Sequence, residues 1–204
     1  MLLAIGLLIG IQQLAKLSGA PEHERETLVS LAIYAMLFSM LLTSIFQTLL
    51  SRYVADMLYR EMPERVMPSL TGASLLLMVP GGLVYALLLM NAPEIPVIDR
   101  VLDWVLFMEL IPIWLQMAYI TAAKDYRRIL EVFAAGVVSA LVLGAAMIFL
   151  GLNAQTTLLI ALVTGYGIML TGFTGVLLRY FPSYRAEING YENFHFFITS
   201  CRSL

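Results

Sequence analysis

Residues 51–61, SRYVADMLYRE, form a charged segment between two long segments without charge. Residues 27–51 before it and residues 66–93 after it contain no Asp, Glu, Lys, Arg or His. A helix rises 1.5 Å per residue, so about 20 apolar residues cross a hydrocarbon core about 30 Å thick. Both flanking segments are long enough. The charged segment therefore predicts a connector at a membrane surface, either a loop or a turn of helix whose arginines extend toward the headgroups.

Three charged side chains of this connector have helical spacing. Arg52, Asp56 and Arg60 follow one another at intervals of four residues. On a helix they share one face, where an Asp–Arg pair stabilises the helix by about 0.3–0.5 kcal/mol. We therefore treat these three residues as one candidate functional segment, the connector.

The connector also carries a resemblance to a known family. Residues 47–59, QTLLSRYVADMLY, and residues 66–73, VMPSLTGA, are similar to the exopolysaccharide Pel transporter family (PelG-like). The similarity continues through Trp114, residues 124–126 and residues 180–182, and so covers most of the chain. Its RYVAD core is the more specific part, because the other positions are largely apolar. The family is placed in the flippase superfamily that includes the multidrug and toxin extruders.

The composition is that of an integral membrane protein. Hydrophobic residues make up 60% of the chain, charged residues 13%, and the mean hydropathy is +0.86. In soluble domains about 45–50% of the residues are hydrophobic and about 25% are charged. A single cysteine, Cys201, excludes an internal disulfide, and His23 and His195 lie outside the apolar segments. The sequence contains no HExxH, Walker-type or GxSxG motif, so we expect no enzyme activity, no cofactor and no metal site.

Apolar segments along the chain predict an all-α bundle of about six transmembrane helices, because backbone groups cannot remain unpaired in lipid. Residues 1–180 would form this bundle as one transmembrane lobe. Residues 181–204 would form a truncated cytoplasmic tail. The first segment lacks the positively charged start of a signal peptide. Within the third apolar segment, residues 69–90, Pro80 predicts a kink in the helix. The predicted spans are residues 1–18, 27–50, 69–90, 101–123, 130–150 and 156–178.

Small residues in the last two spans predict close packing of helices. They recur at or near the small-xxx-small spacing that lets two helices approach each other. We expect these positions to be packing faces rather than ligand sites. They are Gly136, Ala140 and Gly144 in the fifth span, and Gly165, Gly172 and Gly175 in the sixth.

The basic residues are distributed unevenly between alternate loops. Three of the twelve, Lys16, Arg25 and Arg100, precede the even-numbered spans. The other nine follow those spans, so the positive-inside rule places their loops and both termini in the cytoplasm. The resemblance then implies a multi-pass protein of the bacterial inner membrane. The nine are Arg52, Arg60, Arg65, Lys124, Arg127, Arg128, Arg179, Arg185 and Arg202.

Glu109 is the strongest candidate for a functional residue. It lies within about one helical turn of Pro112, near the middle of the fourth span. An ionised carboxylate at that depth costs at least about 2.5–3.5 kcal/mol unless it faces a wet cavity or a partner. Gln116, seven residues further on, shares its face. This face suits sugar hydroxyls, or a proton or cation that drives transport; the alternative is a protonated Glu109 hydrogen-bonded to a neighbouring helix.

Gln47 and Trp114 are weaker candidates for lining a substrate path. Gln47 lies near the cytoplasmic end of the second span, where it could line the mouth of a path or reach headgroup water. Trp114 lies near mid-span, where its indole could stack on a sugar ring or pack against another helix. Trp104 and most tyrosines are expected to be interfacial anchors.

The resemblance implies a function in polysaccharide export. The chain would help to move a hexosamine-rich biofilm polysaccharide across the bacterial inner membrane, together with a glycosyltransferase and other membrane subunits. One alternative is an ion-coupled multidrug extruder, with Glu109 as its coupling site. Another is a non-transporting scaffold that anchors a polysaccharide synthase through its basic loops.

The resemblance also implies a MATE-like arrangement, in which two lobes of six helices surround a central cavity. The chain has the predicted spans of one lobe, so we expect it to correspond to the N-terminal half. We also expect it to pair with a second half or with another copy of itself. An unpaired lobe would turn polar groups of its cavity face toward lipid, which is costly.

Single cysteines at positions 61, 94 and 125, in a background that lacks Cys201, test the predicted orientation. An impermeant thiol reagent added to intact cells is expected to label only position 94, because only that loop is predicted to face outward. Positions 61 and 125 should react after the cells are permeabilised. Labelling of position 125 in intact cells would reverse the orientation.

Overall fold

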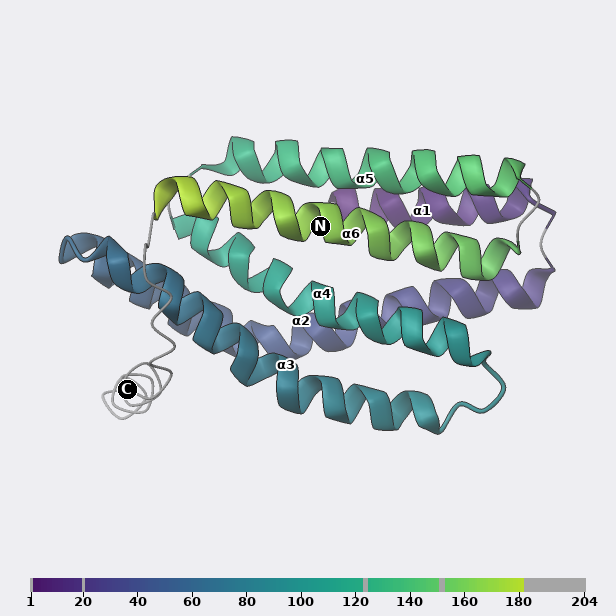
Figure 1. Ribbon diagram of the computed structural model, residues 1–204, viewed down its shortest axis with the longest axis horizontal. Helices are drawn as coiled ribbons and strands as arrows, with labels where there is room; N and C mark the ends of the chain where they lie inside the picture. The colour runs from purple at the N-terminus through teal and green to yellow at the C-terminus, as the bar shows by residue number, and fades with distance from the viewer. Residues whose placement is uncertain (1, 20, 123–124, 151–152, 182–204) are drawn as a thin grey trace.

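The computed structural model describes residues 2–19, 21–122, 125–150 and 153–181 (Figure 1). Within these ranges the chain forms six α-helices and no strand, which confirms the all-α prediction. A short 3₁₀ turn, η1 (Pro63–Arg65), precedes the third helix. The helices are α1 (Leu2–Leu17), α2 (Glu22–Tyr59), α3 (Val66–Met90), α4 (Val97–Ala122), α5 (Tyr126–Phe149) and α6 (Ala154–Tyr180).

Successive helices run in opposite directions along the long axis of the bundle (Figure 1). The turn between α2 and α3, the start of α5 and the end of α6 therefore lie at one end. We call it the basic end. This arrangement agrees with the predicted grouping of basic loops, although Lys124, Arg185 and Arg202 lie outside the described residues. The described basic residues of this end are Arg52, Arg60, Arg65, Arg127, Arg128 and Arg179.

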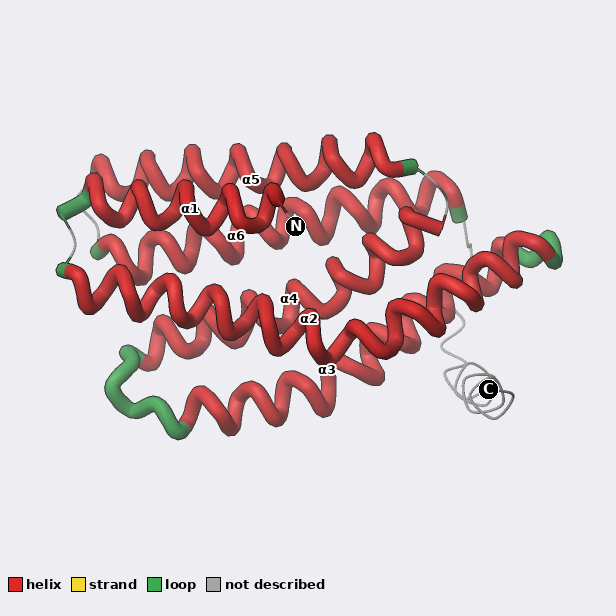
Figure 2. The backbone as a smooth tube through the Cα atoms, turned by 180° about the vertical axis from the view of Figure 1, so that it is seen from behind, coloured by secondary structure: helices red, strands yellow, loops and turns green. Residues whose placement is uncertain are grey.

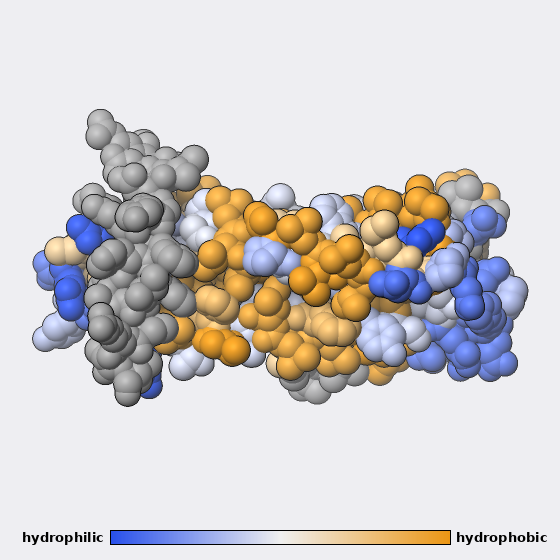
Figure 3. Space-filling model, turned by 90° about the horizontal axis from the view of Figure 1, so that it is seen from below, coloured by the Kyte–Doolittle hydropathy of each residue, from blue (hydrophilic) through white to orange (hydrophobic). Residues whose placement is uncertain are grey.

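A broad band of apolar side chains lies between two polar ends of the molecule (Figure 3). Five helices, α2 to α6, are long and apolar enough to cross a membrane, by length and composition. The sixteen residues of α1 rise about 24 Å, less than a typical hydrocarbon core. A crossing by α1 therefore stays a prediction.

The loop interpretation of the connector is wrong for residues 51–59, because α2 continues through them to Tyr59. Val54 and Met57 are buried there, so the packed face of α2 extends beyond its uncharged segment. The chain turns only at Arg60, whose backbone N–H bonds to the Asp56 carbonyl. The predicted ion pair is present between Asp56 and Arg60, with 3.1 Å between Oδ2 and Nε, whereas Arg52 forms no ion pair with Asp56.

A close helix contact joins α5 to α6, and it depends on small residues. A Cβ added to Gly136 would lie 2.8 Å from the backbone oxygen of Gly165. One added to Gly165 would lie 2.6 Å from Cβ of Ala140. The predicted packing face is confirmed for these residues, but not for Gly175, which has nothing within 4 Å of an added Cβ.

α3 changes direction near its middle, as both Figure 1 and Figure 2 show. Pro80 lies inside this helix and has no N–H to donate to the carbonyl of Leu76. Gly81 and Gly82 follow it directly. The change of direction agrees with the kink predicted at Pro80.

Replacing Gly165 by alanine is expected to destabilise the protein by about 1–3 kcal/mol, because the new methyl group overpacks the contact with α5. Gly175→Ala is the matched control on the same helix. It should be neutral or slightly stabilising, since alanine is the better helix former and the position is open. Thermal unfolding of the two purified variants in one detergent measures the difference; equal midpoints would contradict the packing described.

Candidate functional site

α4 occupies the middle of the bundle, with α2, α3 and α6 packed around it. Its apolar side chains form much of the core; Leu106, Leu110 and Ile113, for example, are fully buried. The same helix also directs polar side chains toward all three neighbours. The candidate site is therefore built on α4.

The contact between α4 and α6 contains a line of polar positions, which we call the α4–α6 seam. The two helices run in parallel, so they meet in a constant register. Glu109 lies beside Gly167, and Gln116 bonds to Thr174, which are both 58 positions later in the sequence. The seam consists of Asp99, Glu109 and Gln116 on α4 and of Gln155, Thr156, Gly167 and Thr174 on α6.

Glu109 lies half-buried in the middle of this seam. Its Oε1 atom would be 3.3 Å from a Cβ added to Gly167, so a glycine at that position makes room for the carboxylate. Its Oε2 atom is buried and has no hydrogen-bond partner in the described part of the chain. This oxygen therefore does not form the hydrogen bond to a neighbouring helix that the alternative interpretation of Glu109 predicts.

Two other polar groups of α4 and α6 are incompletely paired. The amide of Gln116 donates from Nε2 to Oγ1 of Thr174 at 2.9 Å, while its Oε1 has no partner among the described residues. The hydroxyl of Tyr166, next to Gly167, is likewise buried without one. A buried polar group without a partner costs about 1–3 kcal/mol, so such groups are uncommon in stable folds. Their presence here marks the seam as a candidate for binding polar groups.

The seam ends at a carboxylate, Asp99, whose two oxygens both accept hydrogen bonds. This end lies opposite the basic end. Asp99 is buried and accepts hydrogen bonds from Oγ1 of Thr156 at 2.7 Å and Nε2 of Gln155 at 3.0 Å. The helix begins before the predicted start of the sixth span at residue 156, because Gln155 is already within the first turn of α6. This contact joins the start of α4 to the start of α6.

The remaining predicted path residues, Trp114 and Gln47, lie outside the seam. Trp114 donates from Nε1 to Oγ of Ser39 on α2 at 3.0 Å, so its indole N–H serves helix packing. Gln47 is half-buried on α2 and forms no hydrogen bond with the described residues. Their roles in a path stay predictions.

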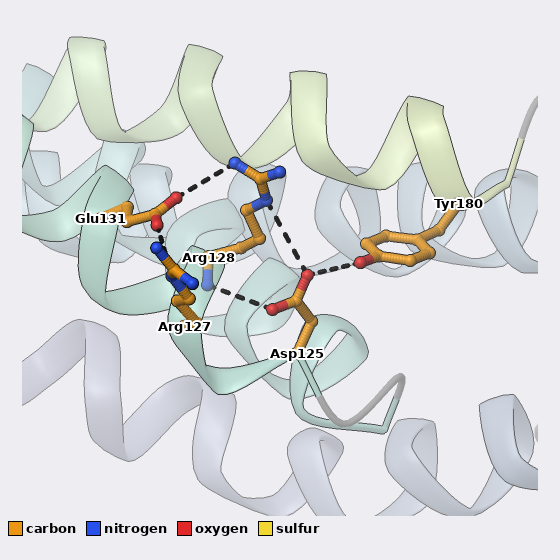
Figure 4. A network of polar contacts seen from close by, with 5 residues as sticks. All are labelled: Asp125, Arg127, Arg128, Glu131 and Tyr180. Carbon is orange, nitrogen blue, oxygen red and sulfur yellow. Dashed lines mark hydrogen bonds and ion pairs between the residues drawn. The ribbon is translucent and has the colours of Figure 1, made fainter.

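At the basic end, a network of charged and polar side chains joins the start of α5 to the end of α6 (Figure 4). Asp125 caps α5 by accepting a hydrogen bond from the backbone N–H of Arg128 at 3.2 Å. Its other oxygen accepts one from the hydroxyl of Tyr180 on α6. Glu131 accepts hydrogen bonds from Arg127 at 2.9 Å and from Arg128 at 3.0 Å. The network fixes the entry of α5 relative to α6.

Comparison with protein-family models matches residues 1–200 to PelG, described as "Putative exopolysaccharide Exporter (EPS-E)". The chain belongs to the PelG family. This confirms the resemblance carried by residues 47–59 and 66–73, while the placement in a larger superfamily stays a prediction. Comparisons with curated proteins and with solved structures gave no match. Membership of PelG supports a role in polysaccharide transport.

The sequence pointed to Glu109 and Gln116 in this PelG-family chain but missed the groups opposite them. Gly167 and Thr174 were not singled out, although they are seven residues apart, as Glu109 and Gln116 are. Matching heptad spacing on two helices was the signal available. It acquires meaning only once α4 and α6 are known to be parallel neighbours.

Tyr180→Phe is expected to raise the pKa of Asp125. The hydrogen bond from Tyr180 is the largest cause that holds this pKa below its ordinary value; partial burial opposes it, and the backbone N–H of Arg128 and the charges of Arg128 and Arg127 lower it further. Because the pKa is lowered by folding, the stabilising effect is present above the unfolded pKa and lost as pH falls through the folded one. Carbon-13 NMR of labelled aspartate measures the pKa, with the exposed Tyr126→Phe as control; equal pKa values in both variants would contradict the network.

Proposed function

We propose that this chain is a transporter component that moves a hexosamine-rich polysaccharide across the bacterial inner membrane, with the α4–α6 seam as part of the path. Membership of an exopolysaccharide exporter family supports a role in polysaccharide transport. The location of the path rests on one observation: Oε2 of the Glu109 carboxylate is buried in the bundle and has no partner among the described residues. No other predicted path residue combines charge, burial and a missing partner.

The chemistry of the seam suits sugar hydroxyls. A hydroxyl group donates one hydrogen bond and accepts others. Oε2 of Glu109 and Oε1 of Gln116 are acceptors to which a sugar hydroxyl could donate. A path must bind a polymer well enough to admit it and weakly enough to release it, as conduction through channels also requires. A few separated polar groups in an apolar wall satisfy both conditions.

The basic end is proposed to face the cytoplasm, which follows from the positive-inside rule. A cytoplasmic glycosyltransferase and other membrane subunits would then deliver the polymer at this end, near the connector residues Arg52, Asp56 and Arg60. Gln47 would line the entrance. A second transporter half, or another copy of this chain, would complete the path opposite the seam.

The ion-coupled extruder remains the second candidate, because a carboxylate without a described partner could also take up a proton or a cation. In that case the substrate would be a small molecule, and its efflux would depend on an ion gradient. A scaffold without transport activity would make Glu109 dispensable and the basic connector essential.

Replacement of Glu109 by leucine tests the path. Glu109→Leu is expected to lower export of the polysaccharide at least about tenfold, which corresponds to one lost hydrogen bond to a charged group. Glu109→Gln should preserve export if the carboxylate only contacts sugar, and lower it if the carboxylate carries a proton. Secreted polymer is measured in a host that lacks its own copy, with membrane abundance of each variant checked by immunoblot.

Glu94→Leu is the control, because Glu94 is an exposed acid in the connection between α3 and α4. Normal export by Glu109→Leu would remove Glu109 from the path. Ion-dependent efflux of small cations would favour the extruder. Loss of polymer only when Arg52 and Arg60 are neutralised would favour the scaffold.

A further inference from the structure

The side of α4 that faces α3 carries polar contacts that the proposed path does not use. They follow the antiparallel register of the two helices, and each joins a side chain of α4 to α3. These hydrogen bonds connect the hydroxyls of Ser69 and Tyr119 at 2.9 Å, Nε1 of Trp104 to the Gly82 carbonyl at 2.9 Å, and the Tyr85 hydroxyl to Oδ2 of Asp103 at 2.7 Å.

Pro80 divides these contacts into two groups. Ser69 lies before it, in the half of α3 nearer the basic end, and its contact with Tyr119 is buried. Gly82 and Tyr85 lie after it, in residues 81–90. Pro80 interrupts the hydrogen-bond ladder at the place where α3 changes direction in Figures 1 and 2, and glycine adds backbone freedom there. The two halves of α3 are thus attached to α4 separately, on either side of the kink at Pro80, which is the hinge of the proposal below.

The contacts of Gly82 with Trp104 and of Tyr85 with Asp103 form what we call the latch. The Tyr85 ring also stacks on Phe107, with 4.2 Å between ring centroids and 13° between planes. The absence of a side chain at Gly82 admits Met108, whose sulfur would lie 2.7 Å from an added Cβ. The position of residues 81–90 against α4 therefore depends on a close fit of side chains.

The carboxyl group of Asp103 both favours and opposes closure of the latch. Asp103 is fully buried, and its Oδ1 atom has no partner among the described residues. No described basic side chain forms an ion pair with it. Closing the latch gives the carboxylate one hydrogen bond but removes its other oxygen from solvent, and the second effect opposes the first.

The outer side of residues 81–90 offers little resistance to movement. Its large apolar side chains are exposed, and in a membrane they would be covered by lipid. Lipid can continue to cover them when this half of α3 moves, because lipid tails are as apolar as the side chains. These side chains are Leu83, Val84, Leu87, Leu88 and Met90.

We propose that residues 81–90 form a gate at the end opposite the basic end, held closed by the latch. Asp103 lies one helical turn from Asp99, where the α4–α6 seam ends. Opening the gate would expose the side of α4 that faces α3, one helical turn from the end of the seam. The role of the gate in export rests on the proposed function, whereas the hinge and the latch do not.

Spin-label distances test the hinge without any transport assay. The full chain, reconstituted in lipid nanodiscs without Cys201, carries labels at two exposed positions, Leu87→Cys on the gate and Phe149→Cys on α5. Tyr85→Phe removes the hydroxyl of the latch and keeps the ring. It is expected to increase the population with a longer 87–149 distance about tenfold.

The control pair is Thr71→Cys with Tyr126→Cys, on the other half of α3 and the other end of α5. Its distance should not change in Tyr85→Phe. An unchanged 87–149 distance would overturn the hinge, and equal changes in both pairs would mean that α3 moves as one rigid helix, which would also overturn it.

Cross-linking tests whether export requires the gate to open. Gly82→Cys with Met108→Cys would lock residues 81–90 to α4, and export is expected to fall at least about tenfold and to return on reduction. The control lock is Gly144→Cys with Ala161→Cys, across the close α5–α6 contact, where an added Cβ lies 3.4 Å from Cβ of Ala161. Full export by the locked gate would overturn its role. If the unmodified chain exports no polymer, the proposed function fails, and the spin-label distances still decide the hinge.

Discussion

The polar side chains of α4 must find their partners inside the bundle, and the placement of the other helices depends on this constraint. Lipid offers no hydrogen bonds, so each unpaired group in its interior is costly. α4 meets the constraint in part, with a different neighbour on each side: Trp114 bonds to Ser39 of α2, Asp103 to Tyr85 of α3, and Gln116 to Thr174 of α6. Oε2 of Glu109 is the exception in the α4–α6 seam, because it has no partner among the described residues. A helix with apolar side chains alone could pack in many rotations, whereas these hydrogen bonds permit one.

The bundle combines a contact made by backbone atoms with a contact made through side chains. Gly136 and Gly165 bring α5 and α6 so close that even a methyl group would overlap backbone or Cβ atoms. The half of α3 beyond Pro80, in contrast, is held by hydrogen bonds of side chains, from Tyr85 to Asp103 and from Trp104 to the Gly82 carbonyl. Close backbone packing resists displacement because every neighbouring atom must move, but a hydrogen bond between side-chain ends can break alone. Movement is therefore expected on the α3 side of α4.

Uncharged segments and small-residue spacing were enough to predict the helices, the grouping of basic loops and the α5–α6 face. The continuation of α2 through residues 51–59 was not decided by the sequence, since it depends on the burial of Val54 and Met57 against other helices. Glu109 and Gln116 could be named as candidates from charge, depth and spacing. Their partners could not, because a single sequence shows which residues are polar but not the register between helices.

That register explains why the buried carboxylate is tolerated. α5 returns the chain to the opposite end, so α6 runs parallel to α4 and keeps a constant offset from it. Glu109 is thereby level with Gly167, where Oε1 lies 3.3 Å from the position of an added Cβ. A larger side chain at 167 would displace the carboxylate or separate the helices. The acid can remain between α4 and α6 because the glycine opposite leaves space for it, so the candidate site is a property of two helices in register rather than of one charged residue.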